Sequence, residues 1–150
     1  MTASIFTDGS CLGNPGNGGF AAIGLLNPEG EGEGEPLFKI SGGETFTTNN
    51  VMELKGVING IEKAKQIGWS HFTLYTDSNY IVQGISNWID NWVSNNWKTS
   101  TGKDVKNKGL WQRLHKLKTP HIQIVWVKAH NGNRWNEEVD KMARACAQLI

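Results

Sequence analysis

The sequence has little cysteine and almost no excess of charge of either sign. Its two cysteines, Cys11 and Cys146, lie far apart in a chain of 150 residues. Two distant cysteines do not make a disulfide framework, and their spacing is not that of zinc ligands. Reduced thiols in a cytosolic protein are therefore the simpler interpretation. The formal net charge is +1, so total charge does not indicate a nucleic-acid partner and local patches would have to do so.

Long apolar runs are also missing. No apolar stretch approaches the roughly 18 residues that a membrane span needs, and residues 1–6 lack the charged region and long apolar run of a secretory signal. We therefore predict a cytoplasmic protein without membrane contact. A hydrophobic content of 38% and a charged content of 19% are typical of a soluble globular chain. Without a repeat or a linker, this length predicts one domain, residues 1–150.

Apolar periodicity and turn residues divide the chain into three strands followed by alternating strands and helices. Strands are predicted at residues 3–7, 20–26, 37–40 (with a continuation to Thr45 left open), 72–76 and 122–127. Helices are predicted at residues 51–67, 79–85, 110–117 and 137–149, a turn at 13–19, a hairpin tip at 27–36, and a helix with an exposed loop within 88–109. Thr48 or Asn49 can cap the first helix, and Gly68 can end it. This order predicts a mixed α/β sheet flanked by helices.

Four acidic residues adjoin apolar sequence, where an unpaired charge is unfavourable. Asp8 and Asp77 end predicted strands, whereas Glu53 and Asp140 lie on predicted helices. Clustered carboxylates repel one another and need protons, basic partners or metal ions. Oxygen ligands suit Mg²⁺, and paired Mg²⁺ ions serve phosphoryl transfer. Spacing alone leaves a second interpretation open, in which these acids are turn residues and partly buried ion-pair partners.

Five segments carry motifs that occur together and in order. They are residues 6–16 (FTDGSCLGNPG), 47–54 (TTNNVMEL), 76–80 (TDSNY), 95–111 (NNWKT, VKN and LW) and 126–140 (beginning WVKAH and ending at Asp140). Together they resemble the signatures of the bacterial type 1 ribonuclease H family over nearly the whole chain. The resemblance implies a ribonuclease H-like fold, with a five-stranded mixed sheet of three antiparallel and then two parallel strands. It also implies one catalytic domain without a separate hybrid-binding domain.

The resemblance further implies an enzyme, an endonuclease that hydrolyses the RNA strand of RNA–DNA hybrids. Two Mg²⁺ ions, with Mn²⁺ as a substitute, would act in the substrate complex and leave 5′-phosphate and 3′-hydroxyl ends. Asp8, Glu53, Asp77 and Asp140 would be the catalytic metal ligands. His130 would lie on a loop and assist proton transfer or product release. The expected partner is the hybrid duplex, bound by a monomer.

The implied substrate contacts fall on two strands of the hybrid. Those to the RNA strand are Gly9, Cys11, Asn49, Asn50 and Asn79, and those to the DNA strand are Asn14, Thr48 and Trp88. The residue chemistry agrees, because short amides both donate to and accept from 2′-hydroxyls. A flat indole suits a sugar that lacks the hydroxyl, and the helix start near Thr48 offers free N–H groups to a phosphate.

Three departures from the family pattern concern binding. Phe46 precedes the Thr47–Thr48 pair where a basic residue is common, and Asn79 stands where a longer amide is common. The protrusion, residues 88–109, is neutral over residues 93–96, and its lysines are accompanied by Asp90 and Asp104. We predict weak hybrid binding with a shallow salt dependence. Phe46 either faces the DNA strand or packs into the core.

The sequence disfavours three other interpretations. Another nuclease or strand-transfer enzyme of the same general fold is disfavoured by the TTNN segment and the Trp-bearing protrusion. A non-catalytic nucleic-acid-binding module is disfavoured by the presence of all four acids. A dinucleotide fingerprint at Gly16, Gly18 and Ala21 is rejected because a strand follows it. The tryptophans are packing residues by default, and Trp126, inside a predicted strand, should be buried.

Overall fold

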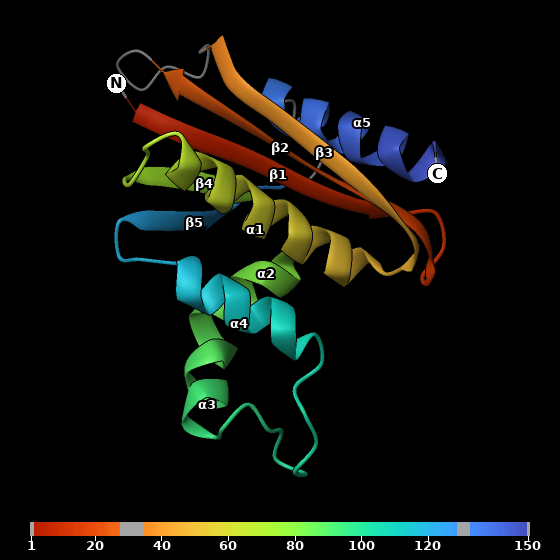
Figure 1. Ribbon diagram of the computed structural model, residues 1–150, viewed down its shortest axis with the longest axis vertical. Coiled ribbons are helices and arrows are strands. Elements are labelled where there is room, and N and C mark those ends of the chain that lie inside the picture. The colour runs from red at the N-terminus through yellow and green to blue at the C-terminus, as the bar shows by residue number, and fades with distance from the viewer. Residues whose placement is uncertain (1, 28–34, 129–132, 150) are drawn as a thin grey trace.

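A five-stranded mixed sheet organises the protein (Figure 1). The computed structural model describes residues 2–27, 35–128 and 133–149. The strands are β1 (Thr2–Cys11), β2 (Gly16–Asn27), β3 (Glu35–Thr47), β4 (Phe72–Thr76) and β5 (Ile122–Trp126), in the spatial order β3-β2-β1-β4-β5. The β1–β2 and β2–β3 pairs are antiparallel, and the β1–β4 and β4–β5 pairs are parallel. The predicted sheet is therefore confirmed; of the expected hairpin tip, residues 28–34 lie outside the described residues.

Helices lie on both faces of this sheet. They are α1 (Asn49–Gln66), α2 (Asn79–Gln83), a π-helical turn η2 (Gly84–Trp88), α3 (Ile89–Ser94), α4 (Lys108–Leu117) and α5 (Arg134–Gln148). Figure 1 shows α5 alone behind β1–β3 and α1 across the opposite face, beside α4. Within the described part of the chain, no helix is both long and apolar enough to cross a bilayer.

Helix α1 forms where the apolar spacing predicted it. The Thr48 hydroxyl accepts a hydrogen bond from the Val51 N–H at 3.2 Å, which satisfies one of the free donors of the first turn. Leu54, Ile58 and Ile61 recur at three- and four-residue steps and are fully buried. The chain leaves the helix at Gly68, whose φ of 94° suits a residue without a side chain.

Each face of the sheet has its own core. Leu74 of β4 and Ile5 of β1 pack with the buried face of α1 and with Trp111 and Leu114 of α4. On the opposite face, a smaller core joins the sheet to α5 and contains Phe6, Ile23, Trp135 and Val139. Strand β1 contacts α1 on one face and α5 on the other, so it is held from both sides.

Several elements are longer or differently wound than predicted. Residues 16–19, expected as a turn, are the start of β2, and β3 continues to Thr47 through a register shift. A Cβ at Gly19 would lie 2.1 Å from the Ala143 carbonyl oxygen, so glycine there permits close packing on α5 and does not mark a turn. The helix predicted at residues 79–85 is α-helical only to Gln83 and continues as the π-helical turn. Such changes depend on packing that a local pattern does not contain.

Candidate active site

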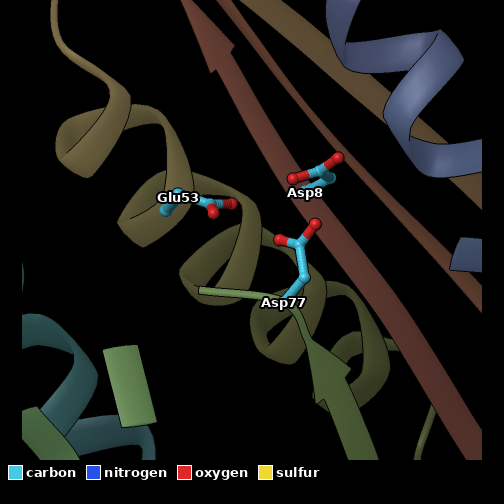
Figure 2. Close-up of side chains that lie close together, drawn as sticks. All are labelled: Asp8, Glu53 and Asp77. Atoms are coloured by element: carbon cyan, nitrogen blue, oxygen red, sulfur yellow. The ribbon is translucent and has the colours of Figure 1, made fainter. Parts of the chain in front are cut away.

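Asp8, Glu53 and Asp77 converge at one edge of the sheet (Figure 2). One oxygen from each carboxylate lies within 4.8 Å of the others. Asp8 comes from β1, Glu53 from α1, and Asp77 directly follows β4. Strands β1 and β4 are parallel, with Phe6 opposite Tyr75, and this register places Asp8 beside Asp77, which follows the carboxyl end of β4. Asp8 does not end its strand as predicted, because β1 continues to Cys11 in its ladder with β2.

Close backbone packing brings Glu53 to the two aspartates. A Cβ at Gly9 would lie 2.4 Å from the Glu53 backbone nitrogen, and one at Gly56 would lie 3.0 Å from the Asp8 carbonyl oxygen. Any side chain at Gly9 would push α1 away from β1. Gly9, expected as a contact to RNA, thus has a second role here: it sets the distance between the helix and the strand that carry two of the acids.

Burial and mutual repulsion make these carboxyl groups weak acids. Desolvation, followed by repulsion from Asp77, raises the pKa of Asp8 from 3.8 to about 8, although the Gly9 N–H donates to its carboxylate at 2.9 Å. Burial and then the charge of Asp8 raise the pKa of Glu53 well above its ordinary value. The pKa of Asp77 is also raised, mainly by desolvation. In the protein alone, this site holds protons that free carboxyl groups would have lost.

The fourth predicted acid, Asp140, lies near this cluster but has a different partner. Its charge contributes to raising the pKa of both Asp8 and Asp77, which places it on the same side of the site. One carboxylate oxygen pairs with the Arg144 guanidinium at 2.9 Å, and the residue lies outside the three-carboxylate group. Arg144 follows Asp140 by four residues on α5, a helical spacing that could have revealed this ion pair from the sequence.

The donor set suits a hard divalent cation. Glu53 Oε1 is buried and has no hydrogen-bond partner among the described residues, although an unsatisfied buried carboxylate oxygen is strongly unfavourable. A cation bound between Asp8, Glu53 and Asp77 would satisfy that oxygen and offset the repulsion that raises their pKa values. Three observations therefore support a cation site: the unpaired Glu53 oxygen, the closeness of the three carboxylates and their mutual repulsion.

Three of the predicted substrate-binding residues surround the start of α1. The Asn14 side-chain oxygen accepts from the Asn49 backbone N–H at 3.2 Å, which ties the β1–β2 turn to the helix. Thr48 caps the helix through the hydroxyl contact to Val51, and the Asn49 side chain is exposed. The structure thus brings Asn14, Thr48 and Asn49 together. The side chains of Asn14 and Thr48 also stabilise the start of α1.

The remaining predicted contacts are more dispersed. Cys11 is partly buried, and its thiol lies 3.4 Å from the Gly16 carbonyl oxygen and 3.3 Å from that of Thr47. Asn50 lies on the first turn of α1, partly buried, and Asn79 begins α2 with its side chain exposed. Trp88, which ends η2, is 37% exposed and packs edge-on against Tyr80 with ring centroids 5.9 Å apart. His130 lies outside the described residues.

Two aromatic residues change the sequence-based picture. Phe46 is 81% exposed, so the alternative that it packs into the core is wrong. Its φ of 49° falls at the register shift between β2 and β3, where the ring turns outward. Trp126 is 49% exposed, and the prediction that it is buried is wrong because β5 is an edge strand. Its indole N–H instead donates to the Asp77 carbonyl oxygen at 3.2 Å, a support for the site that the sequence did not indicate.

Fold and site together define a class of protein: a mixed α/β domain with a group of close carboxylates that is compatible with a divalent cation. A family model described as RNase H matches residues 2–148. A ribonuclease H of Neorickettsia sennetsu is 48% identical over 141 residues, which are 93% of this chain and 89% of that protein. One of a Bradyrhizobium species is 49% identical over 142 residues, 94% of this chain and 86% of that protein.

Solved structures agree with the sequence comparison. The crystal structure of LC9-RNase H1, described as a type 1 RNase H with the type 2 active-site motif, is similar with a TM-score of 0.84 and 30% identity, covering 98% of this chain and 72% of that one. LC11-RNase H1, solved in complex with an RNA/DNA hybrid, shares the fold with a TM-score of 0.74 and 20% identity, covering 99% of this chain and 98% of that one. The chain belongs to the ribonuclease H family. It is a hydrolase of that family, as the sequence resemblance implied.

Proposed function

We propose that this protein hydrolyses the RNA strand of RNA–DNA hybrids with two Mg²⁺ ions and leaves 5′-phosphate and 3′-hydroxyl ends. The observation that carries the proposal is the convergence of Asp8, Glu53 and Asp77 within 4.8 Å, with Asp140 close enough to raise the pKa of two of them. The ribonuclease H names of the relatives support the same chemistry.

The chain's own contribution is to hold charge and geometry. Mg²⁺, when bound, supplies Lewis-acid stabilisation of the phosphate and lowers the pKa of water. Asp8 and Asp77 are fixed by two parallel strands, and Glu53 is fixed by the packing of α1 on Gly9. Since these groups are positioned before substrate arrives, little reorganisation remains for the reaction. The ion pair with Arg144 orients the Asp140 carboxylate, which would serve as a further ligand for the metal.

Selection of a hybrid would depend on residues on either side of this cluster. Asn49 and Asn50 at the start of α1, and Asn79 at the start of α2, can donate to and accept from 2′-hydroxyls of the RNA strand. Gly9 and Cys11 would lie beside them. Asn14 and Thr48 flank the free N–H groups of the α1 N-terminus, which suits a phosphate of the DNA strand. Trp88 is 37% exposed, and its indole would contact sugars that lack the hydroxyl.

Further parts of the proposal concern proton transfer and the form of the enzyme. His130 would exchange a proton with the leaving group or assist product release, as an imidazole near neutral pH can. Mn²⁺ would substitute for Mg²⁺ because both prefer oxygen ligands. We also propose that residues 1–150 act as one catalytic domain, as a monomer in the cytoplasm.

A cleavage assay tests this function. A labelled RNA–DNA hybrid, single-stranded RNA, duplex RNA and duplex DNA would be incubated with the protein, with and without Mg²⁺. We expect cleavage of only the hybrid, of only its RNA strand, and only with a divalent cation. Phosphatase sensitivity of the fragments would identify the 5′-phosphate. Equal cleavage of duplex DNA would instead support a less selective nuclease of the same fold.

A further inference from the structure

Two histidines lie side by side at the end of the sheet that is remote from the carboxylates. His71 directly precedes β4 and His121 directly precedes β5, and these strands pair in parallel with Phe72 opposite Ile122. The register therefore places His71 beside His121, and their ring centroids are 4.2 Å apart with the planes inclined by 32°. Both side chains are exposed. Asp77 follows the other end of β4, about 20 Å away for an extended strand of this length.

Local hydrogen bonds hold this pair in place. The Ser70 hydroxyl oxygen lies 2.9 Å from His71 Nδ1, and when Nδ1–H donates to that oxygen, Nε2 is left as a free acceptor. The Phe72 N–H donates to the His121 carbonyl oxygen at 3.2 Å, and the His121 N–H donates to the Thr119 hydroxyl at 3.2 Å. The two imidazoles thus project from backbones that are already fixed relative to each other. A hydrogen bond from the second ring nitrogen also fixes the tautomer and ring orientation of metal-binding histidines, whose partner there is a carboxylate, a backbone carbonyl or water.

The two imidazoles favour a particular class of metal ion. Neutral imidazoles prefer borderline transition-metal cations such as Zn²⁺, Ni²⁺ and Cu²⁺, whereas Mg²⁺ prefers oxygen ligands. Metal–nitrogen bonds are about 2.0–2.1 Å long, and rotation of the two adjacent rings about χ2 can direct one nitrogen of each to a common ion. Two nearby positive charges oppose a cation: Lys65 lines the same hollow of about 360 Å³ as Ser70 and His121, and Lys118 donates to the Thr119 carbonyl oxygen at 3.4 Å. Lys65 is the one inside the hollow. Its ammonium group, however, is hydrogen-bonded to the Leu117 carbonyl oxygen.

We propose that His71 and His121 form a binding site for one borderline divalent transition-metal cation, with water completing its coordination, separate from the carboxylate site. Such an ion would link the starts of β4 and β5. Two ligands held on neighbouring strands bind more tightly than one because the second contact is made within the molecule, a gain of about 10²-fold or more. Because binding occurs only in the folded protein, the ion would also raise the thermal unfolding midpoint.

Ni²⁺ titration by calorimetry, in excess Mg²⁺ to occupy the carboxylate site, tests this proposal. The parent protein should bind one Ni²⁺ per chain, and His71→Ala and His121→Ala should each weaken that binding by about 10²-fold. His115→Ala is the matched control, since His115 is also an exposed histidine but lies on α4 against Trp97. Its affinity for Ni²⁺ should equal that of the parent protein.

Two further measurements separate the outcomes. Melting curves should show a Ni²⁺-dependent rise in Tm for the parent and for His115→Ala, and none for the two other variants. Mg²⁺-dependent cleavage should be unchanged in His71→Ala and His121→Ala, which confirms that they are folded. Retention of parental Ni²⁺ affinity in either variant would overturn the site, as would loss of that affinity in Asp8→Asn.

Discussion

The carboxylate cluster and the protrusion place their acidic side chains in opposite environments. Asp8 is buried beside other acids, and the pKa of its carboxyl group is raised to about 8. Asp104 is fully exposed in the protrusion, and Lys98 and Lys108 bind it at 2.5 and 3.6 Å and lower its pKa. The carboxylates of the cluster therefore repel one another, whereas in the protrusion one carboxylate is shared by two lysines, Lys98 and Lys108. Reaction and substrate binding should accordingly respond to different mutations.

The largest effect is expected in the cluster. Asp8→Asn or Asp77→Asn removes a charged cation ligand from the three-carboxylate group, so Mg²⁺-dependent cleavage of the hybrid should be abolished. The measurement is turnover at saturating hybrid and Mg²⁺, with a melting curve as the control for folding. Near-normal turnover in either folded variant would contradict the assigned role.

A smaller effect, again on the reaction and not on substrate binding, is expected for His130. His130→Ala removes a general acid–base group, so turnover should fall by roughly 10²-fold, while affinity for the hybrid stays close to the parental value. Single-turnover rates and equilibrium binding measure the two quantities separately. Loss of affinity with unchanged turnover would instead show that His130 is a substrate contact.

The pH dependence of stability tests the repulsion within the cluster. The pKa of Asp8 is higher in the folded protein, about 8, than the 3.8 of a free carboxyl group. Between these values the folded state binds more protons than the unfolded state, so this group lowers stability as pH rises from about 4 to 8. Glu53 and Asp77, whose pKa values are also raised, contribute to the same decline, so without metal Asp8→Asn should make the decline shallower and be more stable than the parent at pH 8.

Chemical denaturation at several pH values, without and with Mg²⁺, measures that difference. Mg²⁺ should reduce the decline in the parent protein because it offsets the same repulsion, and it should have less effect in Asp8→Asn. Identical pH dependence of the two metal-free proteins would show that burial of Asp8 is not accompanied by the inferred proton uptake.

On the protrusion, the informative change is Asp104→Asn. It releases Lys98 and Lys108 from their shared carboxylate, so hybrid binding should tighten and depend more steeply on salt. Each lysine that gains a phosphate contact adds about 0.7–0.9 to the slope of log affinity against log salt concentration. Asp90→Asn, in the same segment, makes the same change in net charge and serves as the control. If both variants gave equal slopes, net charge and not the ion pairs would determine binding.

The smallest effect is expected at Phe46, which belongs neither to the carboxylate cluster nor to the protrusion. Its ring is exposed, so Phe46→Arg should fold with nearly unchanged Tm, because no charge is buried. The variant should tighten hybrid binding and steepen the salt slope by about 0.7–0.9, the value for one phosphate contact. Phe46→Gln removes the ring without adding charge and is the matched control. An unchanged slope in the folded arginine variant would show that this position does not face the DNA strand.

Much of the fold could be predicted because its signals are local. The spacing of Leu54, Ile58 and Ile61, with Thr48 before them and Gly68 after them, predicted α1. The extension of β2 to Gly16 and the π-helical turn after Gln83 were not predicted, since both depend on contacts with distant elements. Gly19, for example, lies in a glycine-rich segment typical of a turn, but in the structure it belongs to β2 and packs closely against α5.

The family and the types of the main elements were predictable from the sequence, and the four acids stood out as candidates, because motifs and apolar periodicity involve neighbouring positions. The tertiary structure was needed to show that three of those acids meet within 4.8 Å while Arg144 binds the fourth. It also decided that Trp126 lies on an exposed edge and supports Asp77, and that Phe46 faces solvent. Burial and repulsion depend on distances across the fold, so the protonation of Asp8 is a property of the packed molecule and not of its local sequence.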